Sequence, residues 1–282
     1  MWIPLLFGNL VGTTGYSIIL RGAIGGRNTD PIFLSAIMSL AVAIPSIVGL
    51  FFADMQWHLF TTKLILFYIA RIVLTLLCHI TNAQALEHAE ASVFAFIFNF
   101  RLGFAAVLGI VFLAEPIIVI QLLGGALVFA AGFVLTGSGA VTKKGFTLSI
   151  LSAIFFAAFT AFEKYLIGAL GYETYMFPST IITAILNWLI VFIGRYPIDK
   201  DFLKSRELPL LMIFRCISAY GFTLALAYGA LLSVSTYISS LSCVTTPIAA
   251  VVFLKEKDNP VKRTIAGVIA VAGATLIFIA TH

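Results

Sequence analysis

Charged residues are scarce in this chain. Asp, Glu, Lys and Arg make up 10% of its 282 residues, whereas a soluble domain carries about 25%. Hydrophobic residues account for 61%, and the mean hydropathy is +1.09. This balance excludes an ordinary soluble domain and indicates an integral membrane protein, with the lipid bilayer as its surroundings.

Cysteine is also rare, and basic residues are not clustered. Cys78, Cys216 and Cys243 are scattered within hydrophobic stretches, which argues against a disulfide framework and a zinc site. The net charge of +5 comes from Lys and Arg that punctuate apolar runs rather than lining one solvated face. We therefore expect no metal, no cofactor and no nucleic-acid partner.

Acidic residues are nearly absent from the hydrophobic segments. All five aspartates lie in polar breaks, and Glu163 is the one acid expected inside a membrane span. The sequence has no HExxH, no GxSxG with partners and no paired aspartates, so we expect no enzyme. A membrane-embedded lipid-modifying enzyme and a non-transporting scaffold are the alternatives to a transporter.

The hydrophobic runs predict an all-α polytopic membrane protein. Crossing about 30 Å of hydrocarbon takes about 20 helical residues. The predicted spans are 2–20, 31–53, 63–86, 91–113, 118–137, 146–167, 174–194, 208–230, 233–254 and 263–280. Span one has no cleavage site and should be retained. The longest polar segment, Arg195–Pro209, is interpreted as a surface linker.

The two halves of the chain resemble each other. Phe-Leu-Ala-Glu ends span four at Glu115, and Phe-Leu-Lys-Glu ends span nine at Glu256. An Ala-Gly pair follows each glutamate, with its glycine seventeen residues on. We predict two five-helix repeats, 1–140 and 141–282. An odd number of spans in each half makes the repeats inverted, which is a recurrent transporter plan.

Small residues are frequent in the last span of each half. Span five carries Gly125, Ala126, Ala130 and Gly132, and span ten carries Ala266, Ala270 and Gly273. Such smooth surfaces predict close helix packing. The two glutamates that precede these spans are expected to fix turns rather than bind substrate.

Three motifs of the first half are informative: Ala-Leu-Glu-His-Ala-Glu-Ala-Ser at 85–92, Phe-Leu-Ala-Glu-Pro at 112–116, and Gln-Leu-Leu-Gly at 121–124. They carry a resemblance to the EamA family of the drug/metabolite transporter superfamily. It implies ten helices in two repeats and a cavity lined by helices one, three, four, six, eight and nine. Arg101 stands where the family usually has a proline, whereas the second half keeps Pro247.

Polar side chains recur at helical spacing in four spans, which marks faces turned to protein or water. The stripes are Asn9, Thr13 and Tyr16; Arg71, Thr75, His79 and Asn82; Ser149, Ser152, Thr160 and Glu163; and Ser235, Ser239, Ser242 and Thr246. For each hydroxyl, bonding to its own helix or to a neighbouring helix is the alternative. The four stripes together favour a shared cavity.

Three arginines fall inside spans, where a charge at the bilayer centre costs at least about 2.5–3.5 kcal/mol. Arg101 lies near the middle of its span, whereas Arg71 and Arg215 lie near the starts of theirs and could snorkel or hold a structural partner. An arginine fork suits a carboxylate or phosphate, so part of the solute is expected to be anionic. The predicted substrate-binding residues are Asn9, Tyr16, Arg71, His79, Asn82, Asn99, Arg101, Glu163, Arg215, Ser235, Ser239 and Ser242.

These features predict a multi-pass transporter of the cytoplasmic (plasma) membrane. It would move a small organic metabolite, an amino acid or a related solute, by alternating access. Few buried acids favour facilitated diffusion or exchange over proton-driven accumulation. The identity of the solute, the direction of transport, the coupling ion and the choice between monomer and homodimer stay open at this level.

The distribution of basic residues predicts that both termini face outward. Lys63 and Lys164 are the basic residues on the side of the termini, and twelve others lie on the opposite side. Because basic short loops stay in the cytoplasm, the second side should be cytoplasmic. EamA proteins more often have cytoplasmic termini. A reporter fused after His282 measures the outcome, and activity of a cytoplasm-specific reporter would contradict the charge count.

Overall fold

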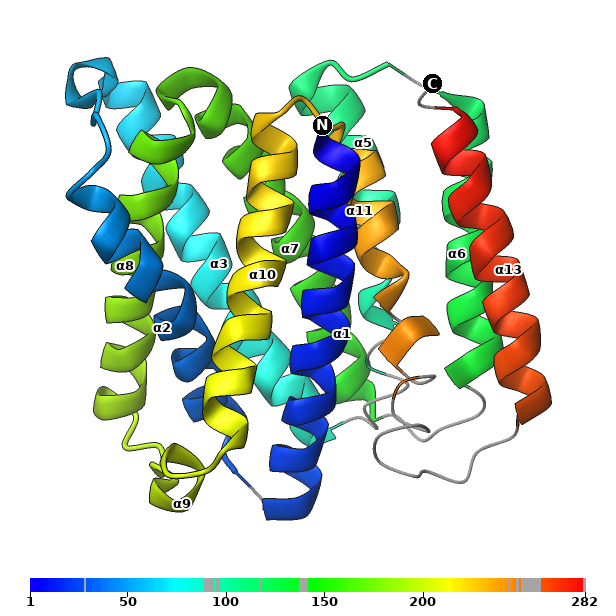
Figure 1. Cartoon of the computed structure of the whole chain (residues 1–282), viewed down its shortest axis with the longest axis horizontal. Helices are drawn as coiled ribbons and strands as arrows, with labels where there is room; N and C mark the ends of the chain where they lie inside the picture. Colours follow the sequence, from blue (N-terminus) through cyan, green and yellow to red (C-terminus); the bar gives the residue numbers. More distant parts are fainter. Residues whose placement is uncertain are drawn as a thin grey trace.

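Every regular element that the computed structural model describes is helical, as the sequence predicts. The described residues are 1–280 without 28, 89–93, 95–96, 117, 137–141, 243, 247–248 and 250–259. Cys243, Pro247 and Glu256 lie outside them. The long helices stand side by side, and α1 begins at the end of the bundle where α13 finishes (Figure 1).

Among the described residues, six helices are long and apolar enough to cross a membrane, so this is a multi-pass membrane protein. They are α1 (Trp2–Arg27), α2 (Pro31–Leu50), α3 (Thr62–His88), α7 (Lys143–Leu170), α8 (Tyr172–Ile193) and α10 (Glu207–Ala227). The remaining helices are α5 (Arg101–Leu113), α6 (Val119–Thr136), α9 (Lys200–Leu203), α11 (Leu232–Ser240), α13 (Pro260–Ile279) and the 3₁₀ turn η1 (Trp57–Leu59).

Two segments expected to be loops are more ordered than predicted. α1 continues beyond the predicted span 2–20, through Gly22, Gly25 and Gly26, and ends at Arg27, because glycines inside a helix lower its stability but do not end it. The predicted linker contains α9, whose Phe202 is fully buried. Asp199 caps α9 by accepting from the backbone N–H of Phe202 at 2.9 Å, and it also accepts from the hydroxyl of Thr29.

Spans four and nine, predicted as single helices, are interrupted. α5 begins at Arg101 after a turn at Asn99 and Phe100, and α11 ends at Ser240 before a turn at Leu241. The N–H of Leu102 donates to the carbonyl of Asn99, three residues back, as in a 3₁₀ turn. The N–H of Leu241 likewise donates three residues back, so the α-helical register changes at both places.

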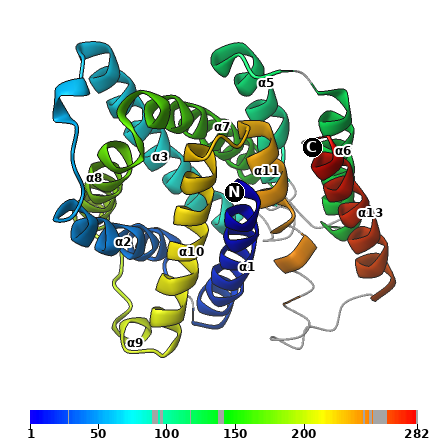
Figure 2. The same cartoon turned by 45° about the horizontal axis from the view of Figure 1, so that its top comes forward.

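The long helices pair across the two halves of the sequence. α1 packs on α10, α3 on α7, α2 on α8, and α6 on α13. The α2–α8 pair forms one edge of the molecule and the α6–α13 pair the other (Figures 1 and 2). The helices between these two edges are α1, α3, α5, α7, α10 and α11. A solute site could be enclosed among them.

Glycines let two of these pairs approach closely. A Cβ added to Gly273 of α13 would lie 2.7 Å from the carbonyl oxygen of Gly124 in α6. In the α1–α10 pair, a Cβ on Gly12 would lie 2.6 Å from the carbonyl oxygen of Phe214. Close packing of the fifth and tenth spans through small residues is thus confirmed, with Gly124 as a contact that the sequence did not single out.

Gly273→Val should destabilise the protein, because the new side chain would clash with the backbone of α6. Overpacking of this kind typically costs about 1–3 kcal/mol. Ala272→Val is the matched control, since Ala272 is exposed on the same helix. Thermal unfolding of the purified protein in detergent measures the difference. Equal midpoints for the two variants would contradict the close contact.

Candidate functional site

A cavity of about 130 Å³ lies among the central helices. Its lining comes from α1, α2, α3, α5, α7, α8, α10 and α11, so both halves of the sequence contribute. Eight predicted site residues line it: Asn9, Tyr16, Arg71, His79, Arg101, Glu163, Arg215 and Ser239. The predicted stripe on α1 and parts of those on α3 and α7 therefore meet in one space, whereas Asn82, Ser149 and Ser152 do not line it.

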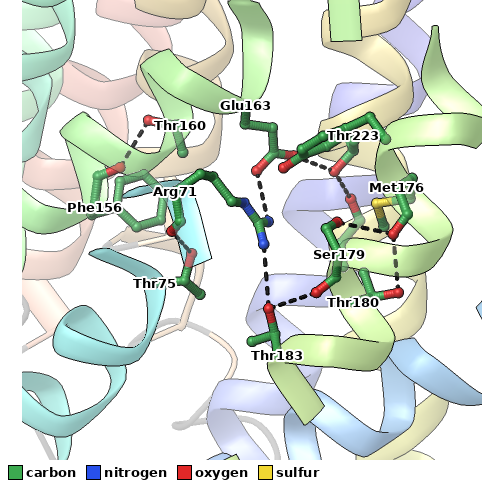
Figure 3. A network of polar contacts seen from close by, with 12 residues as sticks. Arg71, Thr75, Phe156, Thr160, Glu163, Met176, Ser179, Thr180, Thr183 and Thr223 are labelled. Carbon is green, nitrogen blue, oxygen red and sulfur yellow. Dashed lines mark hydrogen bonds and ion pairs between the residues drawn. The ribbon is translucent and has the colours of Figure 1, made fainter. Parts of the chain in front are cut away.

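An ion pair between Arg71 of α3 and Glu163 of α7 crosses one side of this cavity. The Nη2 of Arg71 lies 3.1 Å from Oε2 of Glu163, and both residues are buried. The other carboxylate oxygen, Oε1, accepts from the Thr223 hydroxyl at 2.8 Å. The Nη1 of Arg71 donates to the Thr183 hydroxyl at 3.4 Å, so the network joins four helices (Figure 3).

Because this ion pair is buried, the stability of the protein depends on keeping both of its partners. Removing one partner of a buried ion pair leaves an uncompensated charge and typically costs about 3–5 kcal/mol. The Arg71 guanidinium also lies over the rings of Phe159 and Tyr175, at 5.7 and 5.4 Å from their centres. Its Nε is buried, and no hydrogen-bond partner for it occurs in the described part of the chain. Arg71 is thus held mainly by the protein itself.

Arg101 is held between two aromatic rings. Its guanidinium carbon lies 4.5 Å from the ring centre of Phe98 and 4.6 Å from that of Phe156. Its Nε and Nη2 donate to the hydroxyl of Ser240, at 3.4 and 3.3 Å. The arginine that the sequence placed deepest in a span therefore sits at the start of α5 and bridges to the end of α11.

Arg215 of α10 is less constrained than the other two. Its guanidinium carbon lies 5.5 Å from the ring centre of Tyr16 on α1. Its Nε is buried, and no hydrogen-bond acceptor reaches it among the described residues. No carboxylate in that part of the chain forms an ion pair with it.

Hydroxyl and amide groups join α1 to α10 beside the cavity. The Asn9 side-chain amide donates to the carbonyl oxygen of Ser218 at 2.8 Å, and the hydroxyls of Thr13 and Ser218 lie 2.7 Å apart. The Oδ1 of Asn9 is buried, and none of the described residues donates a hydrogen bond to it. On the opposite side, the amide of Asn187 bonds to Nδ1 of His79 at 3.0 Å.

Four predicted site residues do not line the cavity. Asn82 accepts from the Ser152 hydroxyl at 2.5 Å, between α3 and α7. Asn99 lies in the turn before α5, with its Nδ2 buried and without a partner among the described residues. Ser235 is fully buried in α11, and Ser242 follows the turn at Leu241. Of the three predicted serines, Ser239 lines the cavity and the other two do not.

Several lining residues were missed, and they include residues of α2 and α8. The resemblance implied a cavity without these helices, but Ser39, Val42, Met176, Thr180 and Thr183 also line it. On α8, Thr180, Thr183 and Asn187 follow at steps of three and four, and this stripe could have been recognised. On α10 the residues missed are Ser218, Ala219, Phe222 and Thr223.

Glu115 does more than fix a turn. It follows α5, where Ala114 has a positive φ of 53°, and its Oε1 lies 2.6 Å from Nζ of Lys164. The same oxygen accepts from the backbone N–H of Leu232 at 2.7 Å. A carboxylate at the first turn of a helix is favourable because the N-terminus carries partial positive charge. Glu115 therefore ties the end of α5 to α7 and to the start of α11.

Comparisons with known proteins bear on the fold. No protein-family model matches the sequence, and no curated protein matches it. A solved structure described only as "Crystal structure of protein" is similar over 95% of each chain, with a TM-score of 0.75. The two sequences are 16% identical, so the similarity shows a shared fold and nothing further.

Proposed function

We propose that this chain is a membrane transporter that moves a small organic solute by alternating access between two inverted five-helix halves. The observation that carries the proposal is the polar cavity, which is lined from both halves and contains three arginines. Buried ionisable groups in membrane helices are costly and typically mark a solute or ion pathway. The proposal includes the cytoplasmic membrane as its location and the EamA family as its relatives.

The pairing of helices supports inverted halves. The first helix of each half packs on the third long helix of the other, as α1 on α10 and α7 on α3. The second helices pair with each other, as α2 with α8, and so do the last ones, α6 with α13. If each helix is replaced by the corresponding helix of the other half, the same set of pairs results. A two-fold axis relating the halves would require this. α5, α6, α11 and α13 would then complete the ten spans.

The interrupted helices provide independent support. Glu115 and Glu256 are 141 positions apart, and so are the turn residues Phe100 and Leu241. The two interruptions therefore fall at corresponding places in the repeats. Arg101 and Ser239, which line the cavity, lie beside them. Discontinuous helices around a midplane site are a recurrent feature of transporters built from inverted repeats.

The volume of the cavity limits the solute. Sites for drug-sized ligands enclose roughly 300–1,000 Å³, whereas this cavity measures about 130 Å³. A small metabolite therefore fits the space better than a drug-sized molecule. The lining combines the hydroxyls of threonine and serine with the rings of Phe156, Phe159 and Phe222, so the solute should have a polar end and an apolar body.

Ala219→Trp should abolish transport, because Ala219 lines the cavity and a tryptophan there would fill it. The matched control is Ala227→Trp, since Ala227 is exposed at the end of the same helix. Purified protein in proteoliposomes would be screened for uptake of a panel of labelled metabolites, and both variants would be assayed with each solute that wild type transports. Protein-free liposomes correct for passive diffusion.

Two results would contradict this proposal. One is the absence of saturable uptake of any solute by correctly inserted wild type. The other is equal uptake by Ala219→Trp and Ala227→Trp, which would mean that the solute does not pass through this cavity. Size-exclusion profiles of both variants establish that any loss of uptake does not reflect misfolding.

Uptake should not be driven by an imposed pH gradient. Glu163 is the one carboxylate among the described lining residues, and both of its oxygens are held, by Arg71 and Thr223. Neutralising it would leave Arg71 buried without a counter-charge, which disfavours a proton cycle at this site. Initial rates with and without the gradient test this. Gradient-driven accumulation that is lost in Glu163→Gln or His79→Ala would refute it.

A further inference from the structure

Arg71 and Arg215 occupy corresponding places in the two halves but have different partners. They lie 144 positions apart, on α3 and α10, each of which packs on the first helix of the other half. Arg71 meets a carboxylate on that helix, since Glu163 of α7 lies 3.1 Å away. Arg215 meets the ring of Tyr16 on α1, at 5.5 Å.

The sequence explains why Arg215 has no corresponding acid. Residues 20–25 of α1, Leu-Arg-Gly-Ala-Ile-Gly, align with residues 166–171 at the end of α7, Leu-Ile-Gly-Ala-Leu-Gly. This alignment places Ser17 opposite Glu163. No Asp or Glu occurs anywhere in α1. The repeat that supplies a counter-charge to Arg71 therefore supplies none to Arg215.

The guanidinium group of Arg215 is half-buried, and the burial falls on its Nε. Charged groups removed from water in proteins are normally paired or hydrogen-bonded, because desolvation otherwise disfavours the charged form. The Nε of Arg215 is buried and has no acceptor among the described residues. Since Arg215 lines the cavity, a solute there could supply the missing negative group.

We infer that Arg215 is the anchor for the carboxylate of the transported solute, and that the solute is a small monocarboxylate. The inference rests on the proposed transport function and assigns its substrate class. The carboxylate of the solute would take the place at Arg215 that Glu163 takes at Arg71. A planar guanidinium group binds a carboxylate through two parallel hydrogen bonds, which suits one anionic group of this shape.

The surroundings of Arg215 fit the rest of such a solute. Ser218 and Ala219 follow it on the cavity face of α10, and Phe156, Phe159 and Phe222 add apolar surface. A phosphate dianion would need further cationic partners, but Arg71 is already engaged by Glu163, and Arg101 is held by Ser240 and two aromatic rings. A single carboxylate on an apolar or aromatic body therefore matches the site better than a phosphate ester or a cation.

Matched probes of equal size test the charge requirement. Benzoate, benzamide and benzylamine carry negative, zero and positive charge at neutral pH on the same aromatic body. Each is added in excess to the purified full-length protein in detergent, and the shift in the thermal unfolding midpoint is measured. A ligand that binds the folded state raises that midpoint. Benzoate should raise it, and the other two probes should not.

Variants of Arg215 test the anchor itself. Arg215→Gln should weaken benzoate binding at least about tenfold, because a charge-assisted hydrogen bond is lost. Arg215→Lys keeps the charge without the planar fork and should give an intermediate affinity. Arg206→Gln is the control, since it removes the same charge from an exposed position before α10 and should bind benzoate like wild type.

The outcomes separate this inference from the transport proposal. Equal shifts with all three probes, a larger shift with inorganic phosphate, or benzoate binding unchanged in Arg215→Gln would overturn the carboxylate anchor. If Arg215→Gln does not fold, the three probes on wild type still decide. Saturable uptake of only neutral or cationic solutes would also overturn the anchor while leaving transport intact. Arg215-dependent benzoate binding without uptake of any solute would instead refute transport alone.

Discussion

The buried ion pair between Arg71 and Glu163 is the interaction on which the centre of the molecule depends. A guanidinium group cannot lie among membrane helices at low cost unless a carboxylate and hydroxyl groups surround it. Here the pair spans α3 and α7, and Thr183 of α8 and Thr223 of α10 complete its hydrogen bonds. Four helices from both halves are thereby held around one charged point.

Close backbone contact makes this arrangement possible. Glycines let α1 approach α10 and let α6 approach α13, so helices distant in the sequence pack without intervening side chains. Glu115 adds a second connection, because it joins Lys164 of α7 to the N-terminus of α11. The paired helices enclose the cavity, and the turns beside Arg101 and Ser240 interrupt the two helices between those pairs.

The two arginines differ in their partners, although the proposed repeat gives them corresponding places. In the part of the chain that the structure describes, α7 provides a carboxylate to Arg71, whereas α1 contains none for Arg215. The Arg71–Glu163 ion pair therefore joins the two halves of the sequence. Arg215 faces the cavity without such a carboxylate among the described residues, and the proposed preference for an anion rests on this asymmetry.

The sequence by itself determined that the chain is helical and membrane-embedded, and it identified eight of the residues that line the cavity, because hydropathy and helical spacing are local properties. It did not reveal the interruptions at Phe100 and Leu241, or that Asn99 and Ser242 do not line the cavity. Nor did it distinguish Arg71 from Arg215, since both follow the same pattern. Tertiary structure decided that difference, because the partner of a buried charge comes from a helix far away in the chain.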